Sequence, residues 1–157
     1  MAVAKHAVVL SLVAASFGFA QTGFAQDAQR LFFEGDMVRG AGPGLAGPGC
    51  VLTNQFKRNE MVVWRIRVLD PKTGQALDDK GLNNLVVQLP DGQKFDSHFG
   101  PHPKGKQDDF FWTAAWKVPQ SYPTGTIAYR VMATDKGGRT TTWEPFKSQP
   151  SQLAIVQ

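Results

Sequence analysis

The chain has 157 residues, of which 42% are apolar, with 16 glycines, 10 prolines and a formal net charge of +4. This length is typical of one domain, and the composition is that of a globular protein rich in turns, not of a disordered or fibrous one. One cysteine excludes an internal disulfide framework or a paired-cysteine zinc motif, and the small, scattered excess of basic residues gives little support to nucleic-acid binding.

The first 25 residues have the order of a secretory signal peptide. A start that contains Lys5 is followed by the apolar run 7–19, and small residues then allow cleavage after Ala20 or Ala25. We favour Ala25, because a polar spacer precedes it. The apolar run is too short for an integral membrane segment, so we expect a periplasmic or secreted protein with no membrane segment after cleavage.

Residues 26–49 are predicted to form an N-terminal arm and a Gly/Pro-rich loop, with residues 31–38 adding an edge strand. The loop 40–49 lacks the Lys-Ser/Thr pair of a phosphate-binding loop, so we interpret it as a connector or a partner-docking loop. Cys50 follows it. An unpaired cysteine in an oxidising compartment can be buried, bind a metal, or pair with another chain, and these three alternatives stay open.

From residue 50 to residue 157 the pattern predicts strand after strand. Apolar and polar residues alternate with period two in four segments, and the apolar set of each segment is expected to face one core. These segments are 61–69, 85–89, 110–118 and 127–133. Weaker strands are expected at 51–57, 94–98, 140–146 and 152–156, and a helical turn only at 78–82. Turns rich in Pro, Asp and Gly separate the segments, which favours an all-β, antiparallel two-sheet sandwich.

Large aromatic residues provide most of the predicted core. The candidates are Phe110, Tyr129 and all four tryptophans, Trp64, Trp112, Trp116 and Trp143. Phe111 alternates with its neighbours and is therefore expected on the outer face, where it is either covered or available to a partner.

One short stretch holds the candidate metal ligands. His98 and His102 are the only histidines after the signal segment, and imidazoles bind copper or zinc. With Cys50 they could form a soft copper site, although 47 residues separate Cys50 from His98. The alternative is a solvated polar loop, which we favour because sandwich loops are exposed by default. No nucleophile, base and orienting acid are spaced for catalysis, so we predict no enzymatic activity.

The late part of the chain resembles a known family. Pro123-Thr124-Gly125 forms a turn signature, the following strand ends in Ala133-Thr134-Asp135, and Gly137-Gly138 introduces the next turn. Together with Trp64 on an early strand, these motifs resemble bacterial immunoglobulin-like domains. The resemblance covers about residues 50–156 and implies an immunoglobulin-like Greek-key sandwich. It implies no single activity, because such sandwiches support many functions.

These observations predict an exported, non-enzymatic binding or accessory module that docks to another exported protein. An exposed sheet edge or the loops 40–49 and 98–106 are the expected contact regions, with Phe111, Lys104 and Lys106 as candidate partner contacts. The alternative is a small copper-handling or electron-transfer sandwich that uses His98, His102 and Cys50. Sugar recognition through surface aromatics is a third, weaker hypothesis.

Overall fold

The computed structural model describes residues 30–42, 49–102, 109–148 and 151–157, and these ranges contain strands and turns but no α-helix. The all-β class predicted from the alternating pattern is confirmed. Within the same ranges there is no helix with the length and apolar character that crossing a membrane requires. The predicted signal segment 1–25 lies outside them.

A five-stranded antiparallel sheet forms one layer, with strand order β2-β1-β4-β8-β7. Its strands are β1 (Phe32–Arg39), β2 (Val51–Leu52), β4 (Met61–Leu69), β7 (His98–Pro101) and β8 (Phe110–Lys117). The predicted edge strand at residues 31–38 is thus present as β1. The two residues of β2 pair with the end of β1, and the rest of β1 forms the edge of the sheet.

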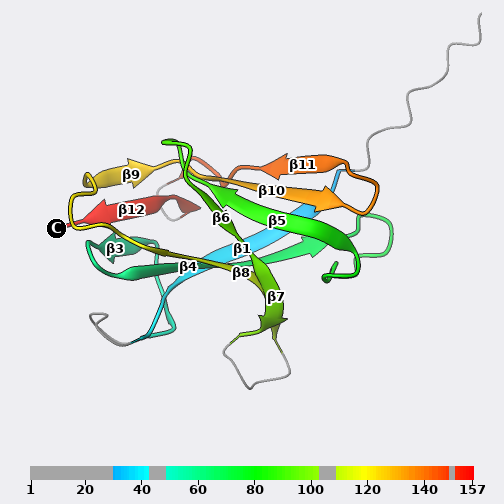
Figure 1. Ribbon diagram of the computed structural model, residues 1–157, viewed down its shortest axis with the longest axis horizontal. Helices are drawn as coiled ribbons and strands as arrows, with labels where there is room; N and C mark the ends of the chain where they lie inside the picture. Colours follow the sequence, from blue (N-terminus) through cyan, green and yellow to red (C-terminus); the bar gives the residue numbers. More distant parts are fainter. Residues whose placement is uncertain (1–29, 43–48, 103–108, 149–150) are drawn as a thin grey trace, which may run out of the picture.

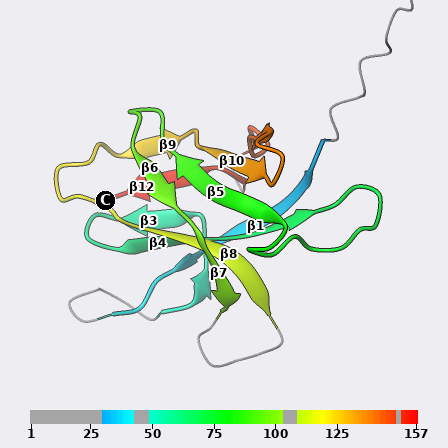
Figure 2. The same cartoon turned by 45° about the vertical axis from the view of Figure 1, so that its right-hand side comes forward.

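The second layer is a four-stranded antiparallel sheet with order β11-β10-β5-β6 (Figures 1 and 2). Its strands are β5 (Leu82–Gln88), β6 (Lys94–Asp96), β10 (Arg130–Asp135) and β11 (Thr140–Trp143). A small third sheet lies near the C-terminal end and contains β3 (Gln55–Lys57), β12 (Leu153–Val156) and β9 (Gly125–Ile127). Its β12–β3 pair is parallel, whereas the sequence pattern predicted antiparallel pairing.

One extended segment belongs to both layers. β6 pairs with β5 in the four-stranded sheet, and β7, which follows at once, pairs with β8 in the five-stranded sheet. Ser97 lies at the crossing point, buried, with its backbone N–H donating to the carbonyl of Leu85 at 2.9 Å. This shared segment holds the two layers together at one side.

The predicted facing of β4 is confirmed. The alternate residues Val62, Trp64, Ile66 and Val68 are buried, while Arg65 and Arg67 point to the opposite face. Trp64 lies at the centre of the core, where its indole stacks on Phe95 and Trp116 and tilts against Tyr129, with ring centroids 5.7–6.5 Å apart.

Two details of the predicted core are wrong. Phe110 is 40% exposed, because it begins β8 where the β7–β8 pair extends past the second layer, and its ring stacks on Phe99. Trp143 is only half-buried and stacks on Phe33 at the edge of the core. The segment 127–133 keeps its predicted inward face but divides after Ile127, because β9 pairs with β12 and β10 pairs with β5.

The turn expected at residues 78–82 is also present. Asp78 accepts hydrogen bonds through its carboxylate from the N–H groups of Lys80 and Gly81, and through its carbonyl from Gly81 and Leu82. The chain then enters β5 without forming a longer helix, because Leu82 begins the pairing with β10.

Candidate functional site

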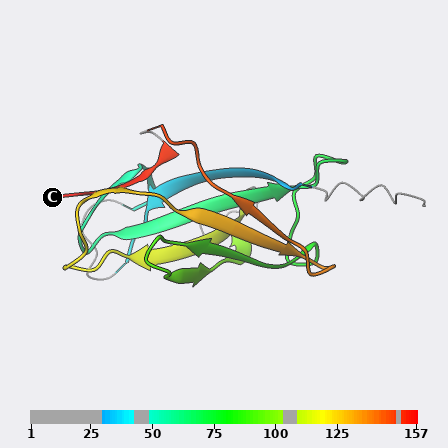
Figure 3. The ribbon, with the colours of Figure 1, turned by 90° about the horizontal axis from the view of Figure 1, so that it is seen from above.

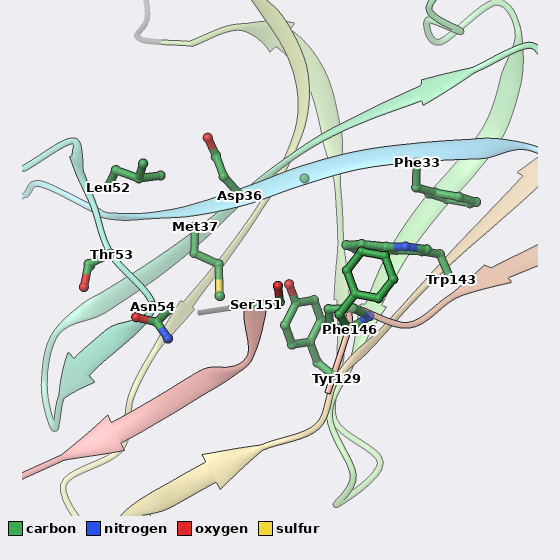
Figure 4. Close-up of a pocket in the computed structure, with 12 residues that line it drawn as sticks. Phe33, Asp36, Met37, Leu52, Thr53, Asn54, Tyr129, Trp143, Phe146 and Ser151 are labelled. Atoms are coloured by element: carbon green, nitrogen blue, oxygen red, sulfur yellow. The ribbon is translucent and has the colours of Figure 1, made fainter. Parts of the chain in front are cut away.

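A groove of about 570 Å³ opens between β1 of the five-stranded sheet and the β11 edge of the four-stranded sheet. The inward-facing residues of β1, Phe33, Gly35 and Met37, form one wall, and Tyr129 and Trp143 form the other. Figure 4 shows the Met37 side chain, the Tyr129 ring and the Ser151 hydroxyl directed toward one another, with Phe33 parallel to Trp143. The groove is therefore lined mainly by apolar and aromatic groups, with a few polar atoms at its floor.

The rim of the groove carries two strongly exposed apolar side chains. Leu52, at the end of β2, is 66% exposed, and Phe146, just after β11, is 82% exposed. Both line the groove. Large apolar groups gathered beside an apolar hollow are characteristic of surfaces that bind a partner or ligand, whereas single exposed apolar residues need no explanation.

The wall of the groove opposite β1 contains a buried phenol, that of Tyr129. Burial raises the pKa of Tyr129 well above its ordinary value, and the negative charge of Asp36 raises it further. The Asp36 carboxylate is directed away from the groove and binds Arg65 on the outer face, with 2.7 Å between Asp36 Oδ1 and Arg65 Nε. The groove thus presents a neutral phenol at all physiological pH values.

This raised pKa makes stability fall at high pH. The unfolded chain loses the Tyr129 proton near pH 10, while the folded protein keeps it, so the folded state binds more protons above that pH. We therefore expect the free energy of unfolding to decrease above pH 10, by as much as about 1.4 kcal/mol per pH unit for this one group. Urea denaturation between pH 9 and pH 11 measures the slope. Tyr129→Phe should reduce it, and an unchanged slope in that variant would contradict the assignment.

Cys50 lies at the edge of the five-stranded sheet, exposed, just before β2. Its backbone has a positive φ of 59°, and its N–H donates to the carbonyl of Arg39 at 2.6 Å, so it closes the turn that returns the chain toward β1. Of the three alternatives left open by the sequence, burial is therefore wrong.

The two histidines lie on the opposite edge of the same sheet. His98 begins β7 and is exposed, and three strands separate β7 from β2, a spacing of about 19 Å between the two edge strands. His102 follows β7, with its N–H donating to the carbonyl of Asp109 at 2.9 Å. His98 and His102 are four residues apart on a largely extended segment, about 13 Å at the usual rise per residue.

His102 is nevertheless an unusual side chain. Its Nε2 atom is buried and accepts or donates no hydrogen bond within the described part of the chain. Burial lowers the pKa of His102, and the positive charge of Arg65 lowers it further, against an opposing effect of Asp36. The imidazole is therefore neutral near pH 7. Across the described ranges, no group of three or more His, Cys, Asp and Glu side chains is arranged to hold a metal ion.

We accordingly expect weak copper binding. Calorimetric titration of Cu(II) at pH 7.5 should give an affinity that Cys50→Ser leaves unchanged. His98→Ala tests the other edge of the sheet. Submicromolar one-to-one binding that is lost in either variant would instead support the copper site formed by His98, His102 and Cys50.

The candidate partner contacts have different outcomes. Phe111 lies on the outer face as predicted, but its ring is partly covered by two guanidinium groups, with Arg65 Cζ 5.2 Å and Arg67 Cζ 4.5 Å from the ring centroid. Arg67 is held there by Asp109, at 3.1 Å. Lys104 and Lys106 lie outside the described residues, as does most of the loop 40–49.

Comparisons with known proteins give no family for this chain. A scan against protein-family models found no match, and a search of curated proteins found no similar sequence.

The groove itself was missed in the sequence. Its walls come from β1, from Tyr129 between β9 and β10, and from residues 143–146 together with Ser151, about 100 positions after β1. One signal was available: Gly35 interrupts an otherwise regular strand, and a glycine inside a strand often marks a place where another group approaches closely.

Proposed function

We propose that this chain is an exported, non-enzymatic binding module with an immunoglobulin-like fold, and that it docks to another exported protein through the groove beside β1. The observation that carries the proposal is the apolar groove with Leu52 and Phe146 exposed at its rim. Apolar side chains at the rim raise the free energy of the protein while they are exposed to water, and a partner that covers them removes this cost.

The immunoglobulin-like assignment has support from the packing. Two antiparallel layers bury Trp64, from an early strand, among other aromatic rings, and a strand segment passes from one layer to the other. Both features suit a Greek-key sandwich of about 100 residues. The bacterial immunoglobulin-like resemblance of residues 122–139 is consistent with this assignment.

The non-enzymatic assignment has support from the chemistry of the groove. Its phenol stays protonated, and the one carboxylate among its lining residues, Asp36, is bound to Arg65 on the other face of β1. General acid–base catalysis needs a group whose pKa lies near the working pH and whose polar atom faces the substrate. Neither Tyr129 nor Asp36 meets both requirements.

Site-specific photo-crosslinking in the native host tests the proposal. A photoreactive phenylalanine analogue at position 52 or position 146 should give one adduct of defined mass, in which the partner is an exported protein. Phe110 is the matched control, because it is also an exposed apolar residue but lies on β8, toward the opposite edge of the sheet. Adducts at position 110 alone, or no adduct at either rim position, would overturn the proposal.

The same preparations test export. The intact mass of the mature protein should show the loss of 25 residues, or of 20 if cleavage follows Ala20. A soluble cytoplasmic protein that keeps Met1 would remove export from the proposed function.

A further inference from the structure

The side of β1 that borders the groove is an open sheet edge. β2 pairs with Val38 and Arg39 only, and the carbonyl of Met37 accepts one more hydrogen bond, from the N–H of Thr53 at 3.1 Å. Between Phe32 and Asp36, the described strands pair with β1 on its β4 side alone. Figure 3 shows β1, in blue, along the side of the molecule with β4 on its inner side.

The alternation of backbone groups fixes which residues face this edge. The carbonyls of Met37 and Arg39 accept hydrogen bonds from the β2 side, whereas the N–H of Gly40 donates to Met61 on the β4 side. Because successive residues of an antiparallel strand bond in opposite directions, Phe33 and Gly35 direct their N–H and C=O groups toward the open edge. Up to four main-chain hydrogen bonds are thus available beside the groove.

Gly35 makes this edge accessible. It is exposed in the middle of the strand, and a Cβ atom added there would lie 3.5 Å or more from every neighbour, the nearest being the Arg65 carbonyl oxygen. Packing within the chain therefore does not require glycine. The missing side chain instead leaves the backbone open to close approach by another backbone.

The two faces of this strand differ in character. Phe33 and Met37 point into the apolar groove, whereas Glu34 and Asp36 point to the outer face. Glu34 is exposed, and no ion pair involving it is formed among the described residues. A strand that pairs here should therefore place apolar residues inward and basic residues outward, since opposite charges on adjacent strands stabilise a sheet.

This charge pattern also selects against self-association. If β1 of a second copy paired with this edge, Glu34 and Asp36 of one copy would lie close to the same acids of the other copy. Like charges facing each other across a strand pair are destabilising. A different polypeptide is the better occupant.

We propose that the groove takes an extended segment of the partner, in which apolar and basic residues alternate, and that this segment adds to β1 as a further strand. The inference rests on the proposed function and specifies the partner's binding segment. Main-chain hydrogen bonds to Phe33 and Gly35 hold the segment, its apolar side chains enter the groove, and its basic side chains lie beside Glu34. This is recognition by strand addition, in which backbone bonds give affinity and alternate pockets give specificity.

Two synthetic eight-residue peptides test the inference with the mature protein, one alternating Val and Lys and the other alternating Val and Glu. We expect the Val/Lys peptide to bind at least tenfold more tightly in calorimetry, although the positive net charge of the protein favours the Val/Glu peptide. Amide exchange measured by NMR should slow at least tenfold at Phe33 and Gly35 when the peptide is bound. Equal binding, or protection at other amides only, would overturn the inference.

Variants of β1 provide the controls. Glu34→Lys, at an exposed site, should reverse the preference between the two peptides. Gly35→Pro removes the N–H that faces the open edge and should abolish binding, while Gly35→Ala keeps that N–H, adds only a methyl group, and should weaken binding less. Circular dichroism establishes folding of each variant, and Glu34→Lys decides the question if Gly35→Pro does not fold.

If the rim crosslinks form but the peptides fail to bind, the docking module stands and the strand-addition inference falls. If the rim crosslinks fail but the peptides bind as expected, the edge binds such segments in vitro and the assignment of an exported partner falls.

Discussion

Replacing Trp64 with alanine is expected to lower the free energy of unfolding by about 3–5 kcal/mol, the range found when a large core aromatic is truncated. The indole is 1% exposed and contacts three other rings, so its removal leaves a cavity between the two layers and takes stacking from Phe95, Trp116 and Tyr129. Urea denaturation monitored by far-UV circular dichroism measures the change.

Phe32→Ala is the matched control for this variant, because Phe32 is a large aromatic residue on β1 that is mostly exposed. Its loss should change stability by no more than about 0.5 kcal/mol. A change below about 1 kcal/mol for Trp64→Ala would place the indole outside the core and contradict the packing of both layers.

The second large effect is expected at Glu60, a buried charge. Its side chain is 6% exposed, its Oε1 atom lies 3.0 Å from Arg39 Nε, and its Oε2 atom accepts the N–H of Lys57 at 2.8 Å. Glu60→Ala removes both contacts and leaves the largely buried Arg39 guanidinium without its counter-charge. We expect a loss of about 2–4 kcal/mol, because an unpaired buried charge costs more than the pair contributes.

A matched ion pair on the surface separates burial from pairing. Asp109 lies 3.1 Å from Arg67, nearly the same distance, but its side chain is 59% exposed. Asp109→Ala should cost about 0–1 kcal/mol, as exposed pairs do. Glu60→Gln keeps an acceptor for Lys57 and should fall between the two. Equal losses for Glu60→Ala and Asp109→Ala would mean that burial does not control the strength of these pairs.

The long strands were predictable because one physical rule determines them. In β4, every second residue from Val62 to Val68 is apolar, and a strand with one buried face requires that period. The same rule located Trp112, Ala114 and Trp116 on the inner face of β8. The rule does not show how far the facing sheet extends. It therefore predicts Phe110 in the core, although the facing sheet ends before this residue.

Contacts between distant segments were not predictable by the same rule. The parallel pairing of β12 with β3 joins residues about 100 positions apart, and a local alternating pattern carries no information on its direction. The groove depends on a similar long-range arrangement of β1 with Tyr129 and Trp143. Whether Cys50 and His98 lie close together also depends on the strand order, which the sequence does not reveal. The observed order places them at opposite edges of the five-stranded sheet.

The position of β12 also determines when the protein can fold. Leu153 and Ile155 are fully buried, and β12 lies between β3, which begins at Gln55, and β9. Closing a loop of this length costs conformational entropy before the new contacts stabilise the chain, so folding of such non-local topologies takes milliseconds to seconds. The core therefore stays incomplete until residues 153–156 have been synthesised. A nascent chain that stops short of residue 153 lacks the buried side chains of Leu153 and Ile155 and leaves β3 and β9 without the strand that joins them.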